Sequence, residues 1–272
     1  MLYGARVTID PATALANACE RAGVEIRLLH DLSELDDARS VFDEVWPSRT
    51  GDTQIPSNLL RALEHAGGYC SAAYATGQVV GAALGFIGRH RDPTGWQIHL
   101  HSHMAAVRQD LRDRRIGTAL KLHQRVWALA QGIPVVTWTF DPLVRRNARL
   151  NLINLGVEVR GFEPDFYGSM DDGINSGDPT DRLFAWWEVA SERADAAANG
   201  ALAPIEDEVL ARHPEWRVIE LPEDIVVLRE RDPQAARAWR LRLRDALTTA
   251  FADGFGIAGL SGDGGYVLRR TP

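Results

Sequence analysis

The chain has 272 residues, a length that allows one large domain or two smaller ones. Its 37 acidic and 30 basic residues leave a net charge of −7, which argues against a general nucleic-acid or anionic-membrane binder, since such proteins carry a basic excess. No apolar run approaches the roughly 18 residues of a membrane-spanning helix. The two cysteines, Cys19 and Cys70, lie far apart, so we expect a cytoplasmic protein with reduced thiols.

We expect an N-terminal arm with a short helix over residues 1–22 and a core domain over residues 23–190. The core should begin with a strand (24–30), a helix capped by Asp31 (31–46), a second helix (59–65) and three strands (69–75, 79–88 and 96–107). Glycine-containing turns separate these three strands, which predicts antiparallel hairpins.

The hydrophobic period then changes from that of a strand to that of a helix. The pattern predicts a helix (116–131), a buried central strand (135–140), a second helix (143–155) and two further strands (158–162 and 182–189). Antiparallel strands followed by alternating helices and strands indicate a mixed α/β fold with a mostly antiparallel central sheet flanked by helices.

An alanine-rich stretch with Asn199-Gly200 makes residues 191–205 the best linker candidate. We expect residues 206–272 to form a β-α-β extension that packs on the core, because a tail of this size is too small for an independent core. Its predicted elements are strands at 216–221 and 225–228, an amphipathic helix at 233–253, and a hairpin of strands at 255–260 and 266–269.

The basic residues gather in two windows although the whole chain is acidic. Residues 107–125 hold six bases and two acids, and residues 144–160 hold four bases and one acid. A small anion could bind there, but two solvated helix faces would give the same pattern. Lys121 is the only lysine, so most lysine-based catalysis is excluded.

A strand followed by an arginine-rich turn, Gly117 and a helix covers residues 103–125. Such a turn presents free backbone N–H groups and the positive end of a helix dipole, which together hold phosphate groups. Gly117 would let a ligand approach the backbone closely. Neither the G-x-G-x-x-G fingerprint nor the G-x-x-x-x-G-K-[ST] loop is present.

This turn resembles the pyrophosphate loop [QR]-x-x-G-x-[GA] of the GNAT superfamily of acyl-CoA N-acyltransferases. Two frames compete: residues 112–117, which put Arg115 at the first glycine, and residues 114–119; we prefer the first. The segments HSHMAAV, WTFDPLVRRNARLNLINLG, FYG and GDPTDRLFAWWE (residues 101–107, 138–156, 166–168 and 177–188) are similar to a branch usually described as predicted acetyltransferases. Some members of that branch are linked to N-succinylamino-acid metabolism.

The resemblance implies acyl-CoA, as acetyl-CoA or succinyl-CoA, as the co-substrate. Backbone groups of Ala105, Ala106 and Val107 would bind its pantetheine arm and polarise the thioester carbonyl. The pyrophosphate would be held by the loop, mainly through backbone N–H groups: Arg112, Asp113, Arg114, Arg115, Ile116, Gly117 and Thr118. Asn147 would contact the cofactor. Many members of the family use a tyrosine as the general acid that protonates the leaving thiolate of coenzyme A. That position holds Leu152 here, so another group or solvent must donate the proton.

An attacking amine must be neutral, so a base with a pKa near 7 is useful. His99, His101 and His103 alternate along one strand and should share a face; His103 and His101 are the candidate bases, although cross-strand packing is the alternative for each. A metal site lacks identifiable further ligands, and we expect none. Asp141 either takes part in catalysis at the end of the central strand or caps the next helix.

Further candidates lie toward the end of the core. Tyr167 is a candidate catalytic residue, while Arg182, Asp181 and Asn151 are candidate substrate contacts, since Arg182 could bind a carboxylate in a forked geometry. We therefore expect transfer of an acetyl, succinyl or similar group to the amine of a small amino acid-like acceptor by direct attack. The alternatives are a catalytically silent acyl-CoA-binding module and an acyl-CoA decarboxylase. We expect a small-molecule amine as partner, with neither nucleic acid nor membrane, and a homodimer remains open.

Overall fold

The computed structural model describes residues 9–48, 51–168 and 178–271. The chain forms two compact units: unit 1 comprises Met1–Thr137 and Glu188–Ala201, and unit 2 comprises Trp138–Trp187 and Leu202–Pro272. The strand β5 (Val135–Phe140) is divided between them. These units cross the boundaries expected at residues 22, 190 and 205, which remain predictions. Residues 1–8 of the expected N-terminal arm lie outside the described residues.

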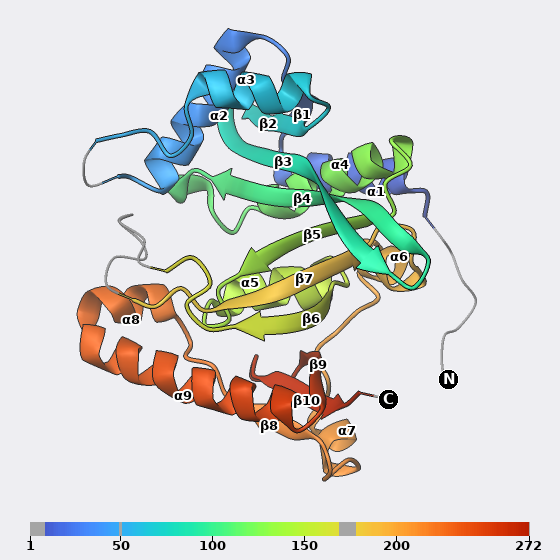
Figure 1. Ribbon diagram of the computed structural model, residues 1–272, viewed down its shortest axis with the longest axis vertical. Helices are drawn as coiled ribbons and strands as arrows, with labels where there is room; N and C mark the ends of the chain where they lie inside the picture. Colours follow the sequence, from blue (N-terminus) through green and yellow to red (C-terminus); the bar gives the residue numbers. More distant parts are fainter. Residues whose placement is uncertain (1–8, 49–50, 169–177, 272) are drawn as a thin grey trace. The chain divides into compact units, whose positions relative to one another are not determined.

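The sheet of unit 1 contains β1 (Glu25–Leu28), β2 (Tyr69–Ala75), β3 (Gln78–Asp92) and β4 (Gly95–Val107). Its order is β1-β2-β3-β4, with antiparallel pairs throughout, followed by the first part of β5, which lies parallel to β4. The predicted hairpins are confirmed. The β3–β4 hairpin is longer than expected, because pairing continues to Asp92 and Gly95, and Figure 1 shows it as a long twisted ribbon.

Helices cover the sheet of unit 1. They are α1 (Pro11–Ala22), α2 (Leu32–Val45), α3 (Ser57–His65), α4 (Ile116–Ala130) and α6 (Glu192–Ala198), with a short 3-10 turn at Gln109–Leu111. The helix α6 lies within the stretch expected to be a linker, and the Ser191 hydroxyl caps it by accepting from the N–H of Ala194 at 3.2 Å. Alanine repetition there supplies helix propensity rather than flexibility.

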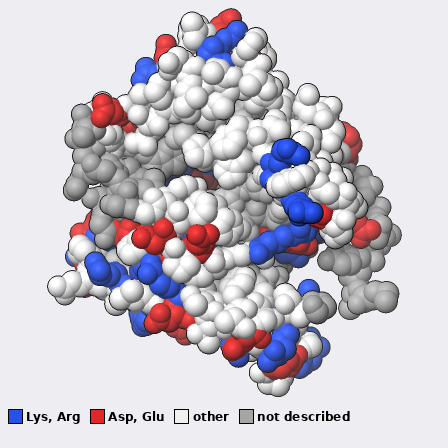
Figure 2. All heavy atoms as spheres, in the orientation of Figure 1, with Lys and Arg blue, Asp and Glu red and all other residues white. Residues whose placement is uncertain are grey.

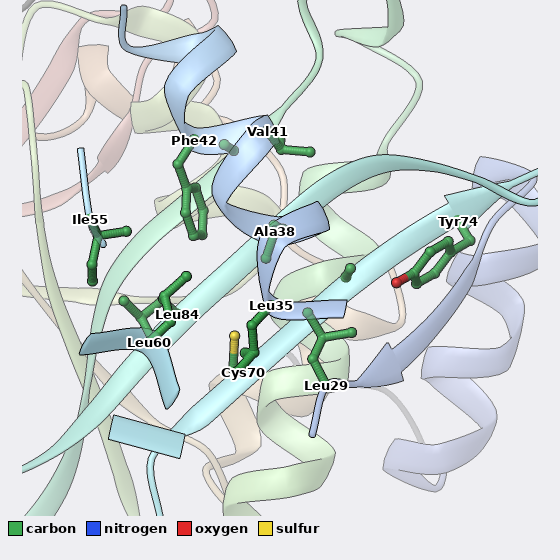
Figure 3. Close-up of a cluster of buried hydrophobic side chains, with 13 residues drawn as sticks. Leu29, Leu35, Ala38, Val41, Phe42, Ile55, Leu60, Cys70, Tyr74 and Leu84 are labelled. Atoms are coloured by element: carbon green, nitrogen blue, oxygen red, sulfur yellow. The ribbon is translucent and has the colours of Figure 1, made fainter. Parts of the chain in front are cut away.

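The core of unit 1 lies between α2 and the sheet. Leu35, Ala38 and Phe42 recur at helical spacing on α2 and are buried against the strands. Figure 3 shows these side chains pointing toward Leu84 of β3 and toward Leu60 of α3. On α4, Ala119 and Leu122 pack with Ala18 of α1 in a second cluster.

Unit 2 contains two sheets. The first has the order β5-β7-β6, with β6 (Glu158–Glu163) antiparallel to β7 (Arg182–Glu188). The second has the order β8-β10-β9, from β8 (Arg217–Ile219), β9 (Phe255–Leu260) and β10 (Tyr266–Arg270). Its helices are α5 (Arg145–Arg149), α7 (Asp207–Ala211), α8 (Ile225–Arg231) and α9 (Pro233–Ala252), and a π-helical turn, Leu150–Asn154, follows α5.

Two predictions in unit 2 need correction. The strand predicted at 225–228 is wrong, because these residues begin helix α8. The Asp224 carboxylate accepts from the N–H groups of Val226 and Val227 at 2.8 and 3.2 Å, and this cap outweighs the strand preference of β-branched residues. The helix predicted at 143–155 is shorter and changes from α to π geometry at Leu150.

Within the described ranges, no helix combines the length and the apolar character that a bilayer crossing requires. On the face of the molecule shown in Figure 2, acidic and basic side chains of the described residues are interspersed and form no single basic surface. This distribution agrees with the acidic net charge of the sequence.

Candidate active site

The turn between β4 and α4 leaves the start of the helix uncapped. The chain leaves β4 with the Arg108 N–H bonded to the carbonyl of Val80 at 3.0 Å, and it passes through the 3-10 turn to Arg115. Asp113 and Arg115 adopt left-handed backbone conformations, with φ of 65° and 64°. In the part of the chain that the structure describes, no side chain caps α4. Its first N–H groups are therefore available to an anion.

The backbone of this turn supports the first motif frame. Arg115 occupies the position of the motif's first glycine, and it has the positive φ that glycine adopts without steric cost. Gly117 has no left-handed φ, and a Cβ placed on it meets no heavy atom within 4 Å. Neither its backbone conformation nor packing against the described residues therefore requires glycine at position 117. The close approach of a ligand to the backbone would require it.

The end of β4 lies beside this turn. Ala105, Ala106 and Val107 pair with Ala83, Ala82 and Gly81 of β3. A Cβ on Gly81 would lie 3.2 Å from the Leu120 side chain, which shows how closely α4 packs on the sheet here. Unit 1 thus brings together the strand and the turn for which pantetheine and pyrophosphate binding remain predictions.

The candidate bases His101 and His103 are neighbours in unit 1. Their ring centroids lie 5.9 Å apart, and Phe86 packs against them at 5.0 and 5.6 Å. The Nδ1 atom of His101 lies 3.4 Å from the hydroxyl of Thr137. His99 instead pairs with His90, with 3.2 Å between their Nδ1 atoms.

A β-bulge modifies the simple alternation predicted for these histidines. Leu84 pairs with Met104 while the next residue, Gly85, pairs with Ser102, so His103 is an extra residue in β4. Burial lowers the pKa of His101 to about 4, with smaller contributions from neighbouring charges, and burial also lowers the pKa of His103. His103 is the more exposed of the two, which makes it the better placed base.

Lys121, the single lysine, is buried on α4. Its ammonium donates to the hydroxyl of Ser102 at 2.7 Å and to the side-chain carbonyl of Gln124 at 3.2 Å. Burial lowers its pKa to about 7. Sequence reasoning missed this group, since a lysine at a buried helical position leaves no local signal apart from its rarity.

Asp141 in unit 2 lies in an ion-pair cluster. Its carboxylate accepts from Arg240 at 2.9 and 2.8 Å, from Arg229 at 2.7 Å, and from the N–H of Leu143 at 2.9 Å. Burial opposes its charged form, but the charges of both arginines and their hydrogen bonds hold its pKa well below the usual range. A carboxylate held so firmly in its charged form is a poor base. The capping alternative is not supported, because the N-cap residue of α5 is Val144 and the bond to Leu143 lies before the helix.

Three other candidates surround the start of β7 in unit 2. Arg182 is buried and lies over the ring of Tyr167, with its guanidinium carbon 5.3 Å from the centroid. The Tyr167 hydroxyl lies 3.0 Å from the hydroxyl of Thr139. The Asp181 carboxylate binds Arg244 and the N–H of Asp165, so its oxygens already have partners within the chain.

The remaining sequence candidates also lie in unit 2. Asn147 is half-buried on α5, while Asn151 is buried in the π-helical turn. Leu152, at the position where the family usually has tyrosine, is buried in the core and has no group that could donate a proton. Among the described residues, no three histidine, cysteine or acidic side chains are arranged to hold a metal ion.

Residues 31–150 match the model of the acetyltransferase (GNAT) family. The matched segment includes the turn between β4 and α4, and the described structure there is the expected mixed α/β fold. This segment is therefore similar to the GNAT acetyltransferase family, whose chemistry is acyl transfer from an acyl-CoA. No curated protein matches the sequence.

Solved structures of acetyltransferases are similar at low identity. An N-acetyltransferase from Staphylococcus aureus Mu50 is 13% identical, with a TM-score of 0.45 over 62% of this chain and 99% of that one. YncA from Salmonella typhimurium, solved with acetyl-CoA, is 19% identical, with a TM-score of 0.49 over 62% and 96%. The ribosomal-protein-S18-alanine N-acetyltransferase from Escherichia coli is 13% identical, with a TM-score of 0.46 over 62% and 97%. The likeness to the family rests on the match of residues 31–150 and not on these structures.

Proposed function

We propose that this protein is a cytoplasmic N-acyltransferase that moves an acetyl, succinyl or similar group from acyl-CoA to the amine of a small amino acid-like acceptor. The observation that carries the proposal is the turn between β4 and α4, with left-handed Arg115, open space at Gly117 and an uncapped helix N-terminus. Such a turn suits a pyrophosphate because its N–H groups and helix dipole favour negative charge.

The residues of unit 1 fit the co-substrate in two stretches. The N–H groups from Asp113 to Thr118 would hold the pyrophosphate, with Arg112 beside them. The backbone groups of Ala105, Ala106 and Val107 that do not face β3 would hold the pantetheine arm. Asn147 of unit 2 stays a proposed cofactor contact. When bound, acyl-CoA supplies the acyl group as an activated thioester.

We assign the role of general base to His103. Burial lowers the pKa of this imidazole, which favours the neutral form whose ring nitrogen can take the proton that the attacking amine loses. His101, packed against it and against Phe86, is the second candidate. Direct attack needs no covalent acyl-enzyme, and Cys70 is unsuited to one because burial raises its pKa to about 12.

Tyr167 is proposed as the group that donates a proton to the leaving sulfur. The family's usual tyrosine position is the buried Leu152, whereas the Tyr167 ring is partly exposed and its hydroxyl can donate. Asp141 is not retained as a base, because its ion pairs with Arg240 and Arg229 keep it charged.

Thermal unfolding in the presence of coenzyme A tests the proposed binding site. Coenzyme A should raise the melting temperature of the wild-type protein, and Gly117→Leu should abolish that shift while folding normally, since its Cβ has open space. Gly262→Leu is the matched control, because Gly262 also has no left-handed φ and no neighbour within 4 Å. The proposal fails if coenzyme A leaves the wild type unchanged or stabilises Gly117→Leu equally.

A further inference from the structure

Three aspartates of unit 2 are paired with arginines from the C-terminal extension. Asp141 and Asp178 share Arg229 of α8 and Arg240 of α9, at distances between 2.7 and 3.0 Å. Asp181 binds Arg244, one helical turn further along α9, with 3.1 Å between Nε and Oδ2. The extension therefore neutralises the carboxylates that follow β5 and precede β7, and Figure 1 shows α9 running along β6.

Arg182 has no such partner. The described chain buries three arginines, Arg125, Arg182 and Arg240. Arg125 pairs with Asp195 at 2.6 Å, and Arg240 pairs with Asp141 at 2.8 Å. Among the described residues, no carboxylate lies within ion-pair distance of Arg182, which is only 8% exposed. A buried, unpaired guanidinium is costly to a fold, so it needs an explanation.

The hydrogen bonds of Arg182 leave most of its donors free. Its Nη1 donates to the carbonyl of Asp181 at 3.0 Å, and no other partner is recorded in the described chain. The buried side-chain atoms that lack a hydrogen-bond partner include Nε of Arg240 but no atom of Arg182. Nε and Nη2 have no partner among the described residues and are not fully enclosed, so they are the donors that this guanidinium could offer to a ligand.

The surroundings of Arg182 favour an anion with a planar, two-oxygen head. Burial lowers the pKa of Arg182. The charge of Asp141 and then Tyr167 oppose this shift, and Arg240 and Arg229 add smaller contributions in the same direction as burial. The oxygens of Asp141 are already occupied by Arg240, Arg229 and the N–H of Leu143. The guanidinium carbon lies over the Tyr167 ring, 5.3 Å from its centroid.

We propose that Arg182 anchors a carboxylate of the substrate. The C-terminal extension creates this site because its arginines form ion pairs with the neighbouring aspartates, which are then not available to Arg182. Two free donors of one guanidinium bind a carboxylate in the forked geometry. The identity of the ligand as a substrate rests on the proposed acyl transfer. Within that reaction the carboxylate belongs either to the amine acceptor or to the acyl group, and both sources share the same chemistry.

Binding measurements test the site without requiring turnover. The probes are succinate, for an acyl carboxylate, and N-acetylalanine, for an acceptor carboxylate, each compared with its amide. At least one acid should raise the wild-type melting temperature while its amide does not. Arg182→Gln should lose this shift, and Arg237→Gln, an exposed arginine on α9, should keep it. Arg182→Lys, which retains the charge without the fork, should bind at least about tenfold more weakly.

The proposal is overturned if neither acid stabilises the wild type more than its amide, or if Arg182→Gln retains the shift. Should Arg182→Gln not fold, unweakened binding by Arg182→Lys overturns it instead. The acid that stabilises identifies the source of the carboxylate.

Kinetics then separate this proposal from the assignment of the reaction. Alanine is compared with alaninamide as acceptor, and succinyl-CoA with acetyl-CoA as donor. The wild type should prefer the carboxylate-bearing member of one pair by at least about tenfold in kcat/KM. Arg182→Gln should remove that preference through KM. If Arg182→Gln lowers kcat/KM equally for both substrates of a pair, Arg182 does not anchor the carboxylate. If the wild type transfers no acyl group with any pair, the proposed function is wrong, and the binding measurements alone test the carboxylate site.

Discussion

The carboxylate of Asp141 accepts two parallel hydrogen bonds from the guanidinium of Arg240, from Nη1 to Oδ1 at 2.9 Å and from Nη2 to Oδ2 at 2.8 Å. The two residues are 99 positions apart in the sequence. This pair ties the end of β5 to helix α9, so the C-terminal extension is an integral part of unit 2. The Tyr266 hydroxyl adds a second tie by donating to the carbonyl of Pro142 at 2.9 Å.

Asp141→Asn should destabilise the protein by about 1–3 kcal/mol, because buried Arg240 and partly buried Arg229 would then share Asp178 as their only carboxylate among the described residues. Urea unfolding at pH 7 measures the change in the free energy of unfolding. Asp245→Asn, at an exposed position on α9, is the control and should change stability by less than about 0.5 kcal/mol. A loss for Asp141→Asn that is no larger than the control would show that the pair contributes no net stability.

Lys121 should make stability increase with pH between 7 and 9. Its pKa is about 7 in the folded protein and 10.5 when unperturbed, so the unfolded chain binds more protons in this window and the free energy of unfolding rises. Lys121→Met should flatten that rise. Urea unfolding at pH 7, 8 and 9 measures the slope in both proteins. The Cys70 thiol ionises earlier in the unfolded chain than in the folded protein and so opposes the rise, but equally in the wild type and in Lys121→Met. Equal slopes for the wild type and Lys121→Met would contradict the assignment.

Arg115→Gly should stabilise the protein by about 0.5–1 kcal/mol. The left-handed conformation costs a non-glycine residue about 1–2 kcal/mol, and the greater freedom of glycine in the unfolded chain offsets part of the gain. Arg114→Gly, in the same turn but without a left-handed φ, should instead lose stability. Calorimetric unfolding of both variants checks the sign. A loss of stability in Arg115→Gly would remove the main support for the motif frame at residues 112–117.

His103→Ala should lower kcat about 100-fold or more, since a general base typically contributes that much. Burial lowers the pKa of His103 from its usual 6.5. In the pH profile of the wild type, kcat should therefore fall at acidic pH as His103 becomes protonated, and this fall should be absent in His103→Ala. Stabilisation by coenzyme A should be unchanged. His65→Ala, an exposed position at the end of α3, provides the control. An unaltered kcat in His103→Ala would transfer the role to His101 or to solvent.

Local patterns predicted most of unit 1. The strand β2 spans Tyr69–Ala75 as expected, and α2 and β4 follow from their apolar spacing and the flanking turn residues. Each of these elements has a hydrophobic period that matches its own geometry, so neighbouring elements need not be known. The strand predicted at 225–228 failed because the cap from Asp224 and the following charged residues favour helix α8.

The chemistry of the candidate site depends on contacts that local patterns do not contain. The bulge at His103 arises from the pairing register of β3 and β4, and alternating histidines give no sign of it. The sequence identified Arg182 and Asp181 as a pair of candidates, but the partner of Asp181 is Arg244, 63 residues away. Such distant ion pairs decide which charged group stays available to a ligand.

Release of free thiol from acetyl-CoA and succinyl-CoA, measured with and without a panel of small amines, tests the proposed acyl transfer most directly. We predict release that requires an amine and is lost in Gly117→Leu. Release without any amine would indicate hydrolysis of the acyl-CoA, whereas a decarboxylase would release carbon dioxide and no thiol. Tight binding of coenzyme A with no release under any condition would contradict the transferase and leave an acyl-CoA-binding module.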